Sequence, residues 1–115
     1  TQNLPRAMGE RRAKELILTG RPFTAAQAEA WGFVNAVHPP AALMPAAIET
    51  ATRIAANAPI SIRQAKQAIH RGLQMSLGEG LAFEIEAYNR MVPTEDRHEG
   101  VLAFNEKRPP RFRGR

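Results

Sequence analysis

The sequence predicts a mainly α-helical protein. Two observations predict this class: apolar residues recur at helical spacing along most of the chain, and Gly or Pro residues divide it into helix-sized segments. A third observation concerns the exception, residues 33–37, whose sequence FVNAV alternates as a strand does. Nothing else in the chain offers a pairing partner, so we expect a helical protein with one short strand-like segment.

The first elements are expected between residues 10 and 32. Glu10–Leu18 has helical spacing, and Gly20 follows it as glycine commonly follows a helix end. Thr24 and Gln27 have the three-residue separation of a capping box, in which each side chain accepts the other's backbone N–H. A short Ala-rich helix should therefore begin at residue 25 and stop at Gly32.

Proline marks the start of the next two helices. Pro45 fits the first position of a helix through about Asn57, and Pro59 fits the first position of the following one. We expect the first of these helices to bury the stripe formed by Ala47, Ile48, Ala51, Ile54 and Ala55.

Capping residues mark the last two helices. Ser76 with Glu79 should begin one helix, and Asp96 with Glu99 should begin another that runs to about Lys107. The first of the two has the longest apolar stripe in the chain, which suits either a core or a subunit contact: Leu77, Leu81, Ile85, Tyr88 and Val92.

Composition excludes several kinds of site. The chain has no Cys, and His38, His70 and His98 lie far apart, so we predict neither a disulfide framework nor a metal site. No apolar run approaches the roughly 20 residues of a membrane helix, and no signal-peptide pattern opens the sequence. We expect a soluble, cytoplasmic protein without a membrane partner. Glu10 and Glu15 are best interpreted as exposed helix positions rather than as catalytic carboxylates.

The net charge of +5 comes from one end of the chain. Residues 107–115 hold five basic side chains and no acid, so residues 1–106 are neutral overall. The tail is either a solvated, partly disordered terminus or a local site for phosphate or another acidic partner. Nucleic-acid binding through this tail is accordingly the alternative function.

Several motifs together resemble a known family. The stretch from Glu15 to Val37, ELILTGRPFTAAQAEAWGFVNAV, resembles the carboxy-terminal part of the crotonase (enoyl-CoA hydratase/isomerase) superfamily. Ala58-Pro59, Ala65-Lys66 and the closing run from Thr94 to Phe112 agree with it, and the opening TQNLPR resembles a segment that follows a Gly-Gly pair in that family. The resemblance covers nearly the whole chain but less than half of a usual family member.

The resemblance implies a fold and a division of the chain. The expected fold is the carboxy-terminal helical, oligomerisation and coenzyme A-contacting part of a crotonase-like α/β protein. Residues 1–37 would end the crotonase core, residues 38–108 would form the helical domain, and residues 109–115 would be the basic tail. Self-association, as a trimer or hexamer of the parent enzyme, is expected.

The predicted binding residues are Phe104 and Lys107. These residues stand three apart on the last predicted helix and so share a face, where a ring can stack on a purine and an ammonium can bind phosphate. In the family, the matching Phe and Lys contact the adenine and phosphate region of coenzyme A. Arg108 is a weaker candidate. Leu4 and Met8 either line the acyl pocket or, on the safer interpretation, simply pack.

The chemistry implied by the resemblance is hydration of a 2-enoyl-CoA, with the coenzyme A thioester as substrate and no separate cofactor. Hydration needs N–H donors for the thioester oxyanion and acid–base groups, for which the hydratases use two glutamates. The family places these upstream of the segment that TQNLPR resembles. We therefore predict no catalytic residue in this chain and no activity from it alone. The reaction within the superfamily and the acyl chain preference depend on residues outside it.

Overall fold

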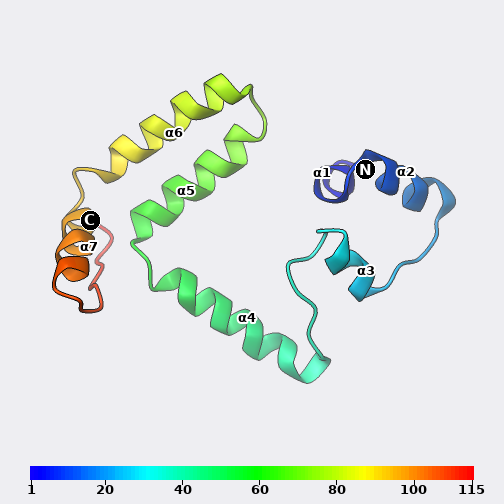
Figure 1. The fold of residues 1–115 in the computed structure, drawn as a ribbon, viewed down its shortest axis with the longest axis horizontal. Coiled ribbons are helices and arrows are strands. Elements are labelled where there is room, and N and C mark those ends of the chain that lie inside the picture. Colours follow the sequence, from blue (N-terminus) through cyan, green and yellow to red (C-terminus); the bar gives the residue numbers. More distant parts are fainter. The chain divides into compact units, whose positions relative to one another are not determined.

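The computed structural model describes all of residues 1–115 and contains seven α-helices and no strand (Figure 1). The helices are α1 (Asn3–Met8), α2 (Glu10–Thr19), α3 (Ala25–Ala30), α4 (Pro40–Ala55), α5 (Pro59–Gly72), α6 (Leu77–Met91) and α7 (Glu95–Asn105). The predicted helical class is confirmed. The chain divides into two compact units, residues 1–47 and 48–115, and α4 crosses the division.

The first unit has a small apolar core between α1 and α2. Met8, Ala13 and Leu16 are buried, and three partly buried apolar side chains pack against them: Leu4, Phe23 and Trp31. Leu4 and Met8 therefore have packing roles in this unit, as the safer interpretation predicted. Gly20 follows α2 in the left-handed conformation, with φ 64°, which confirms the predicted helix end.

The capping box of α3 is confirmed. Thr24 Oγ1 accepts the Gln27 N–H at 3.1 Å, and Gln27 Oε1 accepts the Thr24 N–H at 2.9 Å. The strand-like segment after it is a correction, because the structure forms no strand there. The N–H groups of Phe33 and Val34 both donate to the Ala28 carbonyl, at 2.9 and 3.4 Å. These donors turn back to α3, and a strand would need a neighbouring strand that this chain does not provide.

Helix α4 begins five residues earlier than predicted. Pro40, not Pro45, is its first residue, and the Pro39 carbonyl accepts the Ala42 N–H at 2.8 Å. Pro45 lies inside the helix, where it provides no N–H for the carbonyl four residues back. The predicted buried stripe is also wrong, because α4 buries no residue and Ile48 remains 58% exposed.

Helices α5 and α6 form an antiparallel hairpin (Figure 1). Pro59 is the first residue of α5, as predicted, and Ser76 and Glu79 form the predicted capping box of α6. The hydrogen bonds from the Ser76 hydroxyl and backbone lower the pKa of Glu79. The two helices meet through small residues, with Ala87 buried and Gly72 close to Gly80.

Many large apolar residues of this hairpin remain exposed, although Ile62, Phe83 and Met91 are half-buried. All five members of the predicted α6 stripe are exposed, between 43% and 80%: Leu77, Leu81, Ile85, Tyr88 and Val92. Ile69 and Leu73 of α5 are exposed as well. The stripe is thus a helix face, as predicted, but it is not a core within this chain.

No helix of the structure has both the length and the apolar character needed to cross a bilayer. No group of three or more His, Cys, Asp or Glu side chains is arranged to hold a metal ion.

Candidate functional site at the end of the last helix

The start of α7 differs from the predicted cap. Thr94, not Asp96, caps the helix, and its Oγ1 accepts the Arg97 N–H at 3.2 Å. The Asp96 carboxylate is buried, with the residue only 3% exposed, and it accepts the N–H groups of Arg113 and Gly114 at 2.6 and 2.7 Å. Asp96 therefore holds the carboxy-terminal tail instead of capping α7.

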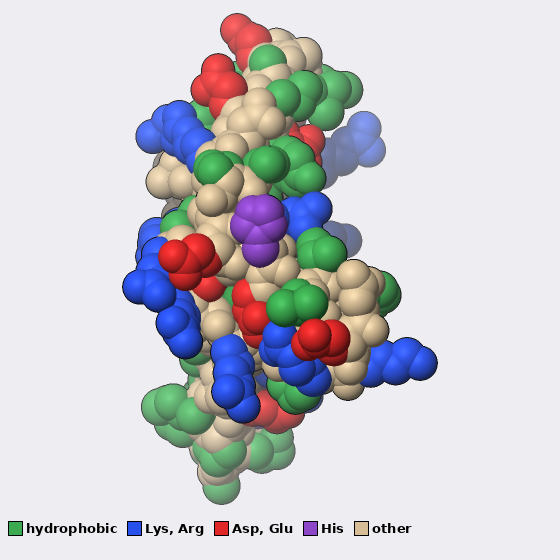
Figure 2. Space-filling view, turned by 90° about the vertical axis from the view of Figure 1, so that its left-hand side faces the viewer, with side chains coloured by type: hydrophobic (Ala, Val, Ile, Leu, Met, Phe, Trp, Pro, Cys, Tyr) green, Lys and Arg blue, Asp and Glu red, His purple; other side chains and the backbone are tan.

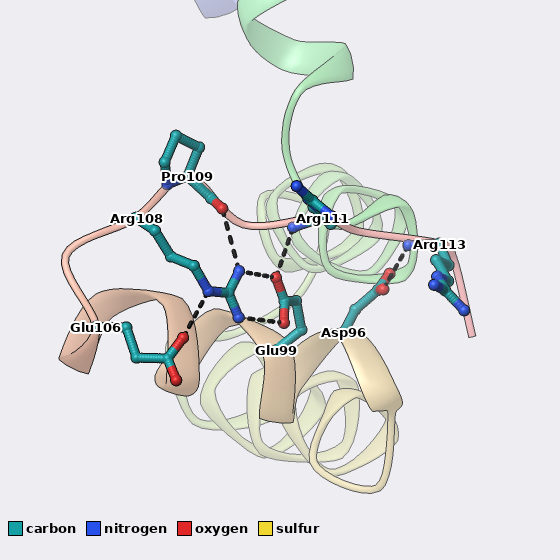
Figure 3. Close-up of polar contacts among 7 residues, drawn as sticks. All are labelled: Asp96, Glu99, Glu106, Arg108, Pro109, Arg111 and Arg113. Atoms are coloured by element: carbon teal, nitrogen blue, oxygen red, sulfur yellow. Dashed lines mark hydrogen bonds and ion pairs between the residues drawn. The ribbon is translucent and has the colours of Figure 1, made fainter.

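The tail is ordered along α7, as Figures 1 and 3 show. The backbone N–H of Asp96 donates to the Arg115 carbonyl at 3.1 Å. Phe112 packs on Gly100, where a Cβ atom would lie 3.6 Å from the phenyl ring. The expectation of a partly disordered terminus is therefore wrong, because buried and charge-assisted hydrogen bonds fix the tail backbone.

Glu99 is the second anchor of the tail (Figure 3). Its two oxygens accept from Arg108 Nη1 and Nη2 at 2.6 and 2.9 Å, and Oε1 also accepts the Arg111 N–H at 2.7 Å. These hydrogen bonds, that of Arg108 first, lower the pKa of Glu99 to about 2. The same pairing, with a further hydrogen bond to Glu106, raises the pKa of Arg108.

The anchoring roles of Asp96 and Glu99 were missed by the sequence prediction. Their three-residue separation also fits a local cap, and their partners lie 9 to 18 residues away. One available signal was the charge asymmetry between the acidic residues of α7 and the acid-free basic tail.

Phe104 is the most exposed large apolar side chain of the structure, at 84%. It borders an open hollow of about 430 Å³, whose lining includes Arg97, Gly100, Val101 and Phe112. An exposed ring of this kind can stack on a planar ligand. Its solvent exposure has no explanation in the packing of this chain.

Lys107 lies beyond the end of α7. The helix ends at Asn105, so the predicted shared helical face of Phe104 and Lys107 does not form. Instead, the Lys107 N–H donates to the Phe104 carbonyl at 3.2 Å, and the Arg108 N–H donates to the Ala103 carbonyl at 3.0 Å. This is a Schellman turn, and Lys107 has φ 53° at the position that glycine usually occupies.

The cations around this turn differ in whether they form an ion pair. Arg108 pairs with Glu99 and Glu106, and Arg115 pairs with Glu95, whereas Lys107 has no ion pair. On the face that Figure 2 presents, Lys and Arg side chains alternate with Asp and Glu side chains rather than forming a uniform basic surface. Lys107 is therefore the free cation closest in sequence to Phe104.

Glu10 and Glu15 are exposed and form surface ion pairs with Lys14 and Arg21. This matches the interpretation of both residues as helix surface positions.

The chain matches known proteins along its whole length. The family described as enoyl-CoA hydratase/isomerase matches residues 1–115. A Bacillus subtilis protein of the enoyl-CoA hydratase/isomerase type is 51% identical over 99% of this chain and 44% of its own length. The 2,3-dehydroadipyl-CoA hydratase of Escherichia coli is 38% identical over 100% of this chain and 45% of its own length.

A solved structure gives the same result. The enoyl-CoA hydratase of Bacillus anthracis is 48% identical and superposes with a TM-score of 0.97, over 99% of this chain and 44% of that one. The chain thus spans less than half the length of each relative, and its helices match the predicted helical part of a crotonase fold. These matches confirm the predicted resemblance: the chain belongs to the enoyl-CoA hydratase/isomerase family.

Proposed function

We propose that this chain provides coenzyme A contacts and subunit association in a cytoplasmic enoyl-CoA hydratase that acts on 2-enoyl-CoA thioesters. The observation that carries the proposal is the exposed Phe104 ring on the helix that ends in the Lys107 turn. Membership of the family over all 115 residues supports it.

Each residue of the pair has a distinct task in this proposal. The Phe104 ring stacks on the adenine base, and the Lys107 ammonium binds a phosphate of the coenzyme. A charge-assisted contact of this kind contributes about 1.5–3 kcal/mol. The substrate is the thioester itself, and no separate cofactor takes part.

The chain leaves the chemical step to residues outside it. Hydration of a double bond needs an acid–base group within hydrogen-bond reach of the reacting atoms, and a preorganised oxyanion site. The acids of α7 are committed to the tail, and Glu10 and Glu15 are paired on the surface. We therefore propose that this chain alone hydrates no substrate.

Subunit association is proposed through the exposed α6 stripe. A soluble protein seldom leaves a large contiguous apolar patch uncovered. The residues of the stripe are exposed in this chain, and a copy of the same chain in a trimer or hexamer would cover them. We further propose that the chain is divided into the end of the core (1–37), a helical domain (38–108) and a tail (109–115). In this division the tail stabilises α7 through its hydrogen bonds to Asp96 and Glu99.

Calorimetric titration with coenzyme A tests the binding proposal. We expect Lys107→Ala to weaken binding by about tenfold or more, since 1.4 kcal/mol corresponds to a factor of ten. The single variant Phe104→Ala should weaken coenzyme A binding more than Lys107→Ala does. Lys14→Ala, which removes an exposed cation of α2, should leave the affinity unchanged. Equal affinity in all four proteins would contradict the proposal.

No observation favours nucleic-acid binding through the tail. Arg108 and Arg115 pair with acidic residues, and the backbone of the tail is held by Asp96 and Glu99. Two of the five cations in residues 107–115 are thus neutralised within the chain, and Lys107, Arg111 and Arg113 have no ion pair.

A further inference from the structure

The turn that carries Lys107 is fixed by its neighbour Arg108. The guanidinium donates to Glu99 through Nη1 and Nη2, to Glu106 through Nε at 2.6 Å, and to the Pro109 carbonyl through Nη1 at 3.2 Å (Figure 3). Four of its five N–H groups are therefore engaged within the protein. Arg108 has little capacity left for an external anion.

The contacts join three separate parts of the chain. Glu99 lies in the middle of α7, Glu106 is the residue at its end, and Pro109 begins the tail. Glu99 also accepts the Arg111 N–H, and its side chain is only 21% exposed. The Glu99 carboxylate thus ties the chain on both sides of Pro109-Pro110 to α7.

Lys107 needs such support. Its φ of 53° is a conformation that residues with a side chain seldom adopt, and its own side chain has no ion pair. If the turn relaxed, the Lys107 backbone would move relative to Phe104, whose carbonyl accepts the Lys107 N–H, and the side chain would move with it. The two-pronged Glu99–Arg108 contact resists this relaxation because its geometry is directional.

We infer that Glu99 is a positioning residue for ligand binding: it holds Arg108 as a clamp, the clamp keeps Lys107 in its turn, and Lys107 alone binds the coenzyme phosphate. This inference rests on the proposed function. It assigns opposite tasks to adjacent cations, because Arg108 is occupied by carboxylates and Lys107 is free.

Simple electrostatics and positioning predict opposite effects for Glu99→Gln. Removing a negative charge beside a phosphate site, or releasing Arg108 to bind the phosphate, should strengthen coenzyme A binding. Loss of the clamp should weaken it. We expect calorimetry to give an affinity about threefold to tenfold weaker, and tighter binding would overturn the inference.

The matched control is Glu95→Gln. It makes the same change of charge on α7 but removes only the exposed pair with Arg115, so coenzyme A affinity should stay within about twofold of wild type. An equal loss in both variants would overturn the inference. If Glu99→Gln does not remain folded in a thermal melt, Glu106→Gln, which removes one contact of the clamp, should give a smaller loss in the same direction.

A double-mutant cycle separates this inference from the proposed function. If Glu99 acts through Lys107, Glu99→Gln should cost nothing further in a Lys107→Ala background. An unchanged affinity in Lys107→Ala itself would contradict the proposed function. A normal Lys107→Ala loss, with an additive Glu99→Gln loss, would overturn only the positioning role.

Titration with 3′-dephospho-coenzyme A identifies the phosphate that Lys107 binds. If the Lys107→Ala effect disappears with this ligand, the ammonium binds the ribose 3′-phosphate. If the effect persists, the ammonium binds the diphosphate. No Lys107→Ala effect with either ligand would overturn the inference.

Discussion

Gly72 and Gly80 face each other at a point where the backbones of α5 and α6 come close together. A Cβ atom on Gly80 would lie 3.5 Å from Gly72 Cα and 3.7 Å from the Gly72 carbonyl oxygen. The two helix backbones are close enough at this point that small side chains alone fit between them. Larger apolar side chains of the two helices therefore lie away from this point, and several of them, such as Leu73 and Leu81, are exposed.

This contact predicts that Gly80 tolerates one methyl group but not a larger side chain. Gly80→Ala makes an ordinary van der Waals contact and adds about 1 kcal/mol of helix propensity. Gly80→Leu should cost about 1–3 kcal/mol, because the helices must separate. Chemical unfolding monitored by circular dichroism measures both. A stabilising Leu variant would show that the helices do not approach this closely.

The buried carboxylate of Asp96 should be a major support of the tail. Asp96→Ala removes two hydrogen bonds to a charged group, so we expect unfolding to become about 3 kcal/mol easier. Asp96→Asn keeps one acceptor oxygen and should cost about half as much. Glu95→Ala, which breaks only an exposed pair, should cost less than about 1 kcal/mol in the same unfolding measurement.

The Glu99 contact should weaken in acid. Because its pKa in the folded protein is about 2, below the ordinary 4.5, the contact contributes fully above pH 4.5 and is lost as the pH falls toward 2. The amide signal of Arg111 in a nitrogen–proton NMR spectrum reports this release. In Glu99→Gln the same signal should not titrate. A wild-type Arg111 signal that stays constant from pH 5 to pH 2 would contradict the assignment.

Lys107 should favour coenzyme A binding but lower the free energy of unfolding. Lys107→Gly relieves the left-handed conformation and should raise the free energy of unfolding by about 1 kcal/mol, while coenzyme A binding falls. Lys107→Ala removes the same ammonium without relieving the backbone, so it should lose binding without the gain. Thermal unfolding and calorimetry on both variants separate the two effects.

The exposed stripe of α6 should mediate self-association. We expect sedimentation at micromolar concentration to show an assembly, and Ile85→Lys, in the middle of the stripe, to shift it toward monomer. Glu86→Lys places the same side chain one position along and should have a much smaller effect. A wild-type protein that sediments as a compact monomer would count against this role.

The local signals of the sequence were sufficient for several contacts between residues within four positions, although the Thr94 cap of α7 was not predicted. The Thr24–Gln27 and Ser76–Glu79 capping boxes, and the left-handed Gly20, are present as predicted. Such contacts depend on backbone geometry within one helical turn. Pro45 shows the limit of this reasoning, because proline is compatible with a helix start without being sufficient to set one.

The candidate site needed the tertiary structure. Phe104 and Lys107 were predicted from a family pattern, but the helix ends between them, and a turn rather than a shared helical face relates the two. The sequence could not assign Asp96 and Glu99 to the tail, because the same residues are compatible with a cap between positions three apart and with partners 9 to 18 residues away.

The sequence by itself determined the helical class and the apolar face of the longer helices, since both follow from short-range periodicity and capping, but it did not specify α1, the start of α4 or the end of α7. Only the tertiary structure decided what covers those faces and where the charged side chains find partners. The small residues of α5 and α6 meet, the α6 stripe remains exposed, and the acids of α7 hold the tail. The physical reason is that burial and ion pairing depend on distances between residues far apart in the chain, which no local pattern specifies.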